Sequence, residues 1–110
     1  MRRFAAMLGA VLMMCLVAAP QAGAALKLYE ESDFLGRVLL NKSAAGNWNL
    51  TGGNNDEASS FNNATQLDGG FWHDSNLRGT CVGMRRQTSA AWFAVWDDNK
   101  ASSVKLGSYC

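Results

Sequence analysis

The sequence predicts an all-β sandwich in which one structural unit is used twice. Several short extended runs follow one another at regular spacing, and turns rich in glycine, asparagine and serine separate them. Beyond the N-terminal segment, no apolar pattern keeps the period of 3.6 residues that a helix needs. The chain also repeats itself, because Asn55 to Ser60 return in altered form as Asp98 to Ser103, 43 positions later (98 − 55). These observations favour stacked β-sheets over a helical architecture.

The same offset aligns the residues in front of the two repeated segments without a gap. We call Asn55 to Ser60 the first hexad and Asp98 to Ser103 the second hexad. A repeat that spans about 40 residues indicates a duplicated structural unit. We therefore expect two motifs, at about 26–64 and about 69–107, and a function that is carried out twice. The further matched pairs are Tyr29 with Trp72, Glu31 with Asp74, Ser32 with Ser75, Asp33 with Asn76, Phe34 with Leu77, and Gly36 with Gly79.

Residues 1–24 are expected to be a secretory signal peptide, which leaves one domain at residues 25–110. Arg2 and Arg3 form a basic start, and an apolar stretch follows from Met7 to Ala19. Small residues then offer a cleavage position after Ala24 or Ala25. The apolar stretch is shorter than the roughly 20 residues that a membrane span needs. We therefore expect no membrane span, and a secreted or periplasmic protein.

Length and charge limit the function classes of the remaining chain. About 86 residues are enough for one small domain, whereas two domains would each lack a core. Without Arg2 and Arg3, eight basic residues stand against nine acidic ones, so the net charge is about −1. Such a balance gives no electrostatic reason to expect nucleic acid or an anionic membrane as a partner. The composition sets no oligomeric state.

The cysteines predict one disulfide. Cys15 falls within the expected signal peptide, which leaves Cys81 and Cys110 as an even pair in an exported chain. A bond between them would close a loop of about 30 residues and stabilise the domain by about 3 kcal/mol. The alternative is a bacterial lipoprotein anchored at Cys15. It fits less well, because Met14 stands where a small residue is expected before a lipidated cysteine.

The first motif is expected to contain a hairpin, a loop and a further strand. Leu26 to Tyr29 alternate as a strand does, and Phe34 to Leu40 form a second extended run that can fold back on the first across the polar residues 30–33. Residues 41–54 are rich in asparagine and glycine, which are costly in helices, so we expect a loop with Trp48 as its anchor in the core. A strand is expected to start at Ser59, and residues 62–70 connect the motifs.

The second motif follows the same order. Phe71 and Trp72 are expected to start a hairpin that turns at residues 73–76 and returns along residues 77–84. Residues 91–96 are apolar throughout, which suits a strand or buried segment covered on both faces. Residues 104–106 alternate again as a last strand does.

The two hairpins resemble the start of a βγ-crystallin Greek key motif. That family's signature is an aromatic residue, four residues, a second aromatic residue, one residue and a glycine. Tyr29, Phe34 and Gly36 match it in full, and Trp72 and Gly79 match it with Leu77 in place of the second aromatic. Both hexads are similar to the family's calcium motif, which is two Asn or Asp, two variable residues, Ser or Thr, and Ser. The resemblance covers residues 26 to about 106.

The resemblance implies a βγ-crystallin-like Greek key sandwich of two motifs, with about eight strands in two sheets and up to two Ca²⁺ ions bound at one edge. Glu31 and Asp74 would each reach the site built mainly by the other repeat, while Ser60 and Ser103 would brace the folded hairpins. The remaining ligands or site-shaping residues would be Asn55, Asp56, the Glu57 carbonyl and the Ser59 hydroxyl in the first copy, and Asp98, Asn99, the Lys100 carbonyl and the Ser102 hydroxyl in the second.

The chemistry of the hexads agrees with this implication. Calcium takes six to eight hard oxygen ligands from carboxylates, carbonyls, hydroxyls and water. Few carboxylates per site leave much of the ion's charge uncompensated, so the expected dissociation constant is roughly 10⁻⁵ to 10⁻³ M. Asn, Asp and Ser also favour ordinary turns, so the alternative interpretation of either hexad is a polar loop that binds no ligand.

Two alternatives concern other functions. Secreted bacterial inhibitors of metalloproteinases share the implied fold, and residues 62–70 or 84–90 would then be the loop that enters an extracellular protease. Trp48, Trp92 and Trp96 could form a sugar-binding or partner-binding surface, although aromatic residues of small β-domains more often belong to the core. An enzyme is not expected, because His73 is the only histidine and no convergent set of titratable groups surrounds it in the sequence.

Overall fold

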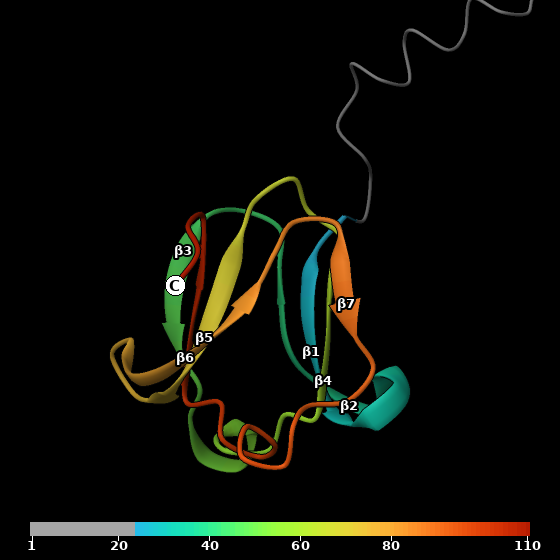
Figure 1. Ribbon diagram of the computed structural model, residues 1–110, viewed down its shortest axis with the longest axis vertical. Coiled ribbons are helices and arrows are strands. Elements are labelled where there is room, and N and C mark those ends of the chain that lie inside the picture. Colours follow the sequence, from blue (N-terminus) through green and yellow to red (C-terminus); the bar gives the residue numbers. More distant parts are fainter. Residues whose placement is uncertain (1–23) are drawn as a thin grey trace, which may run out of the picture.

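The computed structural model describes residues 24–110 and shows two four-stranded antiparallel sheets that face each other (Figure 1). This is the eight-stranded Greek key sandwich that the sequence predicts. The expected signal peptide lies outside the described residues, apart from Ala24. The strands are β1 (Leu26–Glu31), β2 (Leu35–Lys42), β3 (Gly46–Asn49), β4 (Ser60–Asn63), β5 (Gly69–Asp74), β6 (Arg78–Met84), β7 (Thr88–Ala90) and β8 (Ser103–Leu106).

Each motif gives its third strand to the sheet of the other motif. The first sheet has the order β2-β1-β4-β7, and the second has the order β3-β8-β5-β6. Thus β3 of the first motif pairs with β8, and β7 of the second motif pairs with β4. Because of this exchange, both hexads run from one sheet to the other at the same end of the sandwich.

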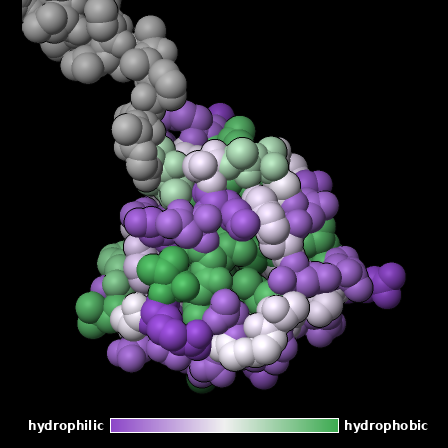
Figure 2. Space-filling model, turned by 180° about the vertical axis from the view of Figure 1, so that it is seen from behind, coloured by the Kyte–Doolittle hydropathy of each residue, from purple (hydrophilic) through white to green (hydrophobic). Residues whose placement is uncertain are grey.

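The core fills the space between the two sheets. Leu26, Leu28, Phe71 and Val104 are fully buried there, and Trp48 packs against the same cluster from β3. Every residue of this cluster lies between positions 26 and 106, so the segment 25–110 contains the whole described core. On the face seen in Figure 2, apolar surface lies between hydrophilic side chains.

The two hairpins have the same backbone conformation. Asp33 and Phe34 have φ of 59° and 61°, and the matched Asn76 and Leu77 have 61° and 58°. Leucine in place of the second aromatic ring therefore leaves the turn unchanged. In the first hairpin, Tyr29 meets Phe34 edge to face with 5.8 Å between ring centroids.

Both the backbone conformation and the lack of room for a side chain require glycine at positions 36 and 79. Each has a φ of 80°, where glycine alone is free of strain. A Cβ on Gly79 would lie 2.6 Å from Oδ2 of Asp74, and one on Gly36 would lie 3.0 Å from Cγ of Glu31. The acidic side chain of each hairpin therefore lies over its own glycine.

The predicted serine braces are confirmed in both motifs. The Ser60 hydroxyl donates to the Glu31 carbonyl at 2.6 Å and accepts from the Phe34 N–H at 3.1 Å. The Ser103 hydroxyl donates to the Asp74 carbonyl at 2.6 Å and accepts from the Leu77 N–H at 2.9 Å. Because both serines are fully buried, these bonds fix each folded hairpin to its own sheet.

Two predictions for single segments are wrong. Residues 41–54 are not loop throughout, because they contain β3, whose Trp48 packs on the core while the strand pairs with β8. Residues 91–96 are not a buried strand: Trp92 is 70% exposed, Val95 81% and Trp96 71%. The strand of this region is β7, which ends at Ala90, and the segment after it is a series of turns.

The predicted disulfide joins Cys81 of β6 to Cys110, with 5.7 Å between their Cα atoms. It holds the C-terminal residues on the outer face of the second sheet. There, a Cβ on Gly83 would collide with the ring of Tyr109, and the Arg85 guanidinium lies 3.7 Å from the centre of that ring. The helical segments within residues 24–110 are two short 3-10 turns, η2 (Ser32–Phe34) and η3 (Gly52–Asn54), and neither is long and apolar enough to span a membrane.

Candidate metal centre

The two hexads meet at one end of the sandwich and hold each other through their backbones (Figure 1). The Asp56 N–H donates to the Ala101 carbonyl at 2.9 Å, and the Asn99 N–H donates to the Ala58 carbonyl at 3.0 Å. These two bonds join positions that are equivalent in the repeat. Ala58 and Ala101 are fully buried, and their small side chains let the two loops approach closely.

The hexads also share an unusual backbone conformation. Asp56 has a φ of 59° and the matched Asn99 has 57°. Only glycine, asparagine and aspartate adopt this left-handed region readily. The second position of the hexad is therefore restricted by conformation as well as by chemistry.

Each serine hydroxyl binds a carboxylate of the opposite hexad. The Ser59 hydroxyl donates to Oδ1 of Asp98 at 2.6 Å, and Oδ1 of Asn99 lies 3.4 Å from the same hydroxyl. The Ser102 hydroxyl donates to Oδ1 of Asp56 at 2.8 Å. Two separate groups of oxygen atoms result, each made by both motifs.

We call these groups site 1 and site 2. Site 1 consists of the Ser102 hydroxyl and the Asp56 carboxylate that it binds, with the Asn55 side chain beside them. Site 2 consists of the Ser59 hydroxyl with the side-chain oxygens of Asp98 and Asn99. The carbonyls of Glu57 and Lys100 stay predicted ligands. The sequence grouped Ser59 with Asn55 to Glu57 and Ser102 with Asp98 to Lys100, so the two serines are exchanged. A sequence repeat shows which residues are equivalent, but it does not show which copy a side chain faces.

Site 1 holds a buried oxygen without a donor. Oδ1 of Asn55 is buried and has no hydrogen-bond partner within residues 24–110. The amide nitrogen of Asn55 lies 3.5 Å from Oδ2 of Asp56. A buried acceptor that lacks a partner costs about 1 to 3 kcal/mol, and a bound cation would remove this cost. The oxygen atoms of site 1 thus fit a hard cation.

Glu31 and Asp74 lie in the folded hairpins beside the hexads. Their backbone carbonyls accept the hydrogen bonds of Ser60 and Ser103, as described above. Their exposed carboxylates make no hydrogen bond to either hexad within the described part of the chain. Their roles as ligands therefore stay predictions.

Site 2 differs from site 1 in charge and in its neighbours. Lys100, at the position of Glu57, is exposed and forms no salt bridge within residues 24–110. Asp97, which precedes site 2, lies 2.9 Å from Nε2 of His73. The His73 side chain is only 22% exposed, and its contact with Asp97 fixes the start of the second hexad.

The donor types also limit which metal fits. Among residues 24–110, no three side chains of His, Cys, Asp or Glu gather as a metal cluster. Zinc and similar ions prefer sulfur and nitrogen ligands, and Cys81 and Cys110 are joined to each other. Carboxylate, hydroxyl, amide and carbonyl oxygens, which the hexads provide, are the ligands of calcium.

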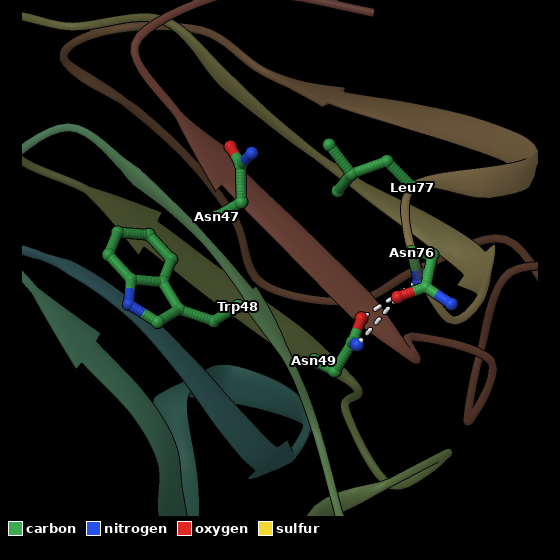
Figure 3. Close-up of a pocket in the computed structure, with 5 residues that line it drawn as sticks. All are labelled: Asn47, Trp48, Asn49, Asn76 and Leu77. Carbon is green, nitrogen blue, oxygen red and sulfur yellow. Dashed lines mark hydrogen bonds between the residues drawn. The ribbon is translucent and has the colours of Figure 1, made fainter.

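A depression of about 270 Å³ lies elsewhere, where the second hairpin meets β3 (Figure 3). Its lining includes Asn49 and Asn76, which form two hydrogen bonds: the Asn49 amide donates to Oδ1 of Asn76 at 2.9 Å, and the Asn76 N–H donates to Oδ1 of Asn49 at 2.8 Å. The other lining residues are Asn47, Trp48 and Leu77, and Figure 3 shows the Trp48 ring pointing away from the asparagines. No charged side chain lines this depression, whose asparagine pair fastens the hairpin to β3.

The loops proposed for protease inhibition hold each other. The Arg86 side chain and N–H bind the Asp68 carboxylate at 2.9 to 3.2 Å, and these hydrogen bonds lower the Asp68 pKa to about 2. The Gln87 amide donates to the carbonyls of Ala64 and Thr65 at 2.8 and 3.0 Å. Protease inhibition itself stays a prediction.

Comparisons with known proteins identify the fold. Neither the protein-family models nor the curated proteins gave a match. A βγ-crystallin domain from Clostridium beijerinckii is 22% identical, has a TM-score of 0.64, and aligns over 76% of this chain and 97% of its own. A βγ-crystallin domain from Flavobacterium johnsoniae is 19% identical, with a TM-score of 0.63 over 74% of this chain and 91% of its own.

Two further solved structures have a similar fold. A chain solved for work on the evolution of the eye lens βγ-crystallin domain fold is 18% identical, with a TM-score of 0.67 over 84% of this chain and 94% of its own. A double mutant of clostrillin in complex with nickel is 22% identical, with a TM-score of 0.64 over 76% of this chain and 98% of its own. At these identities the likeness shows the fold alone.

Proposed function

From the βγ-crystallin fold of this chain, we propose that it is an exported, non-catalytic domain that binds two Ca²⁺ ions, one at site 1 and one at site 2. The exchange of serine hydroxyls between the hexads carries this proposal. It brings a carboxylate and a hydroxyl within 2.8 Å of each other twice, at equivalent places in the repeat. Neither motif alone contains a complete site, which gives a physical reason for the duplication.

The chain would hold each ion with oxygens from both motifs. At site 1 these would be the Asp56 carboxylate, the Glu57 carbonyl, the Ser102 hydroxyl and the Asn55 amide oxygen, which has no hydrogen-bond partner in the described part of the chain. At site 2 the Asp98 carboxylate, the Lys100 carbonyl and the Ser59 hydroxyl would take the same places. An ion that binds only the folded state stabilises it by mass action, by about 2.7 kcal/mol when its concentration is 100 times the dissociation constant.

Removing one serine hydroxyl should remove one site. We expect Ser102→Ala to weaken site 1 and Ser59→Ala to weaken site 2, so that calorimetric titration counts one calcium ion in place of two. The exposed Ser43 lies outside both hexads, and Ser43→Ala is the matched control that should keep both ions. If calcium produces neither heat nor a rise in the melting temperature of the wild type, the proposal fails.

The sites should also differ in affinity because of one pair of matched residues. Glu57 adds a negative charge beside site 1, and Lys100 adds a positive charge beside site 2. We expect Lys100→Glu to tighten site 2 by roughly 5- to 10-fold at low salt, since two charges a few ångströms apart in water interact by about 1 kcal/mol. Glu57→Lys should weaken site 1 similarly. Titration in 0.5 M salt should shrink both effects, whereas effects independent of salt would contradict an electrostatic origin.

Export and the lack of catalysis rest on other observations. The Cys81–Cys110 bond supports an oxidising compartment, where disulfides persist. The contact of His73 supports a structural role for this residue, because its Nε2 lies at hydrogen-bond distance, 2.9 Å, from the Asp97 carboxylate. Sequencing the N-terminus of the protein from its native host tests export, since the expected cut lies after Ala24 or Ala25.

A further inference from the structure

The loop in front of the second hexad exposes three large apolar side chains within five residues. Trp92 is 70% exposed, Val95 81% and Trp96 71%. We call these three residues the apolar tip. Large apolar side chains are seldom exposed in such close succession, and exposed apolar patches mark sites of contact with another molecule.

The apolar tip stands on a firmly held loop. Phe93, within the same segment, lies 5.1 Å from the ring centroid of Phe71 and 6.2 Å from that of Phe61. The Ala91 carbonyl accepts a hydrogen bond from the Asp33 N–H at 2.7 Å. On the other side of the tip, the N–H groups of Asp97 and Asp98 donate to the Ala94 carbonyl at 2.8 and 3.0 Å, so the exposed side chains stand on a segment held before, within and after the tip.

The first motif shows that the fold does not require the apolar tip. The residues equivalent to Trp92, Val95 and Trp96 are Asn49, Gly52 and Gly53. A Cβ on either glycine would meet no atom within 4 Å. The turn is nevertheless shared, because the Asp97 N–H donates to the Ala94 carbonyl at 2.8 Å and the matched Asn54 N–H donates to the Thr51 carbonyl at 3.1 Å. The first motif thus enters its hexad through a turn without apolar side chains at these positions, although Gly52 has a φ of 57° that Val95 does not share.

The position of the apolar tip next to site 2 suggests its partner. Val95 and Trp96 immediately precede Asp97 and Asp98, so anionic groups would be repelled from the tip until a divalent cation is bound there. Tryptophan favours the interface between water and hydrocarbon, since its ring is apolar and its N–H is polar. We propose that the apolar tip inserts into the surface of a bilayer with anionic headgroups, and that calcium at site 2 bridges the acidic loop to their phosphates.

Shape and size favour a bilayer over other occupants. The three side chains are each at least 70% exposed and so project from the surface, whereas small ligands bind in concave pockets. A specific protein partner needs about 800 Å² on each side, more than three side chains supply. The inference rests on the proposed calcium binding, which also explains why a chain with a nearly neutral net charge would associate with an anionic surface.

The test uses residues 25–110, which contain the whole described core, so that the apolar N-terminal segment cannot itself bind lipid. Vesicles of phosphatidylcholine and phosphatidylglycerol (1:1) are mixed with the protein in calcium or in chelator, then sedimented. Tryptophan fluorescence is recorded in parallel. We expect co-sedimentation and a blue shift in calcium with the anionic vesicles, and neither with phosphatidylcholine alone nor in chelator.

The first motif supplies the matched variant. The triple change Trp92→Asn, Val95→Gly, Trp96→Gly gives the second loop the residues of the first, and should weaken vesicle binding at least tenfold while calcium still raises the melting temperature. If that variant does not fold, Val95→Glu at the most exposed position tests the same point. Trp48→Phe, on β3 and packed on the core, should bind vesicles as the wild type does.

Each outcome bears on one of the two proposals. If calcium raises the melting temperature but vesicles do not bind, the membrane inference is wrong and calcium binding stands. If calcium leaves the melting temperature unchanged, calcium binding itself is wrong. Vesicle binding in chelator, or self-association of the protein in calcium in place of vesicle binding, would also overturn the inference.

Discussion

Replacing both bracing serines by alanine should lower the melting temperature by about 15 to 30 °C. Ser60 and Ser103 are each fully buried, and each hydroxyl satisfies one N–H and one carbonyl of a folded hairpin. Losing such a hydroxyl leaves two backbone groups short of a partner, which costs about 2 kcal/mol per serine. The two braces lie in different sheets, so their effects should add. For a domain of this length, 1 kcal/mol corresponds to about 4 to 8 °C.

The neighbouring serine provides the contrast that separates bracing from metal binding. Ser59→Ala should cost little stability in chelator but remove one calcium ion, whereas Ser60→Ala should cost stability and keep both ions. Thermal unfolding in chelator and calorimetric titration measure the two properties separately. Ser89→Ala on the exposed part of β7 is the control. Equal effects of Ser59→Ala and Ser60→Ala on both properties would contradict this division of roles.

The fold could be predicted from the sequence because its strongest signals lie in special backbone positions. Gly36 and Gly79 occur where φ is 80°, and the hexads place Asp56 and Asn99 at φ near 60°. Few residue types tolerate these conformations, so the residues at these positions can be recognised in a sequence even when the overall similarity is low. The hairpins and the two motifs were therefore predicted correctly. The Cys81–Cys110 bond was predicted for another reason, since these are the two cysteines that remain after the expected signal peptide.

The two wrong segments show where local patterns lose information. Gly46, Asn47 and Asn49 have low strand propensity, and β3 forms because its partner β8 and the burial of Trp48 override that propensity. Residues 91–96 are all apolar, so their sequence indicates a buried segment. In the structure the segment turns, so that Phe93 packs against the core while Trp92 and Trp96 are exposed to solvent. An apolar run does not state which of its side chains face the core.

The pairing of the two hexads could not be predicted from the sequence. Ser59 and Ser102 follow their own hexads in sequence, yet each hydroxyl binds a carboxylate of the other hexad. This exchange arises from the way β3 and β7 cross between sheets, which is a property of the whole fold. The contact between His73 and Asp97 joins residues 24 positions apart, which no local sequence pattern reveals.

Removing the disulfide by the double change Cys81→Ser, Cys110→Ser should lower the free energy of unfolding by about 3 kcal/mol, because the unfolded chain regains the freedom of a loop of about 30 residues. Such a loss is a large fraction of the 5 to 15 kcal/mol that keeps a small domain folded. Thermal and urea unfolding of the oxidised wild type and the double variant measure it.

The disulfide loss should be independent of calcium. The bond lies over Gly70 on the outer face of the second sheet, where a Cβ would come within 3.0 Å of the Cys81 sulfur, whereas the hexads lie at the end of the sandwich. Trp72 pairs with both Cys81 and Ser103, so the two regions are joined through the backbone of β5. Contributions of side chains that do not touch each other mostly add, so the difference between variant and wild type should be nearly the same in calcium and in chelator. If calcium abolishes that difference in the free energy of unfolding, then the disulfide and the calcium sites stabilise the domain together and not independently.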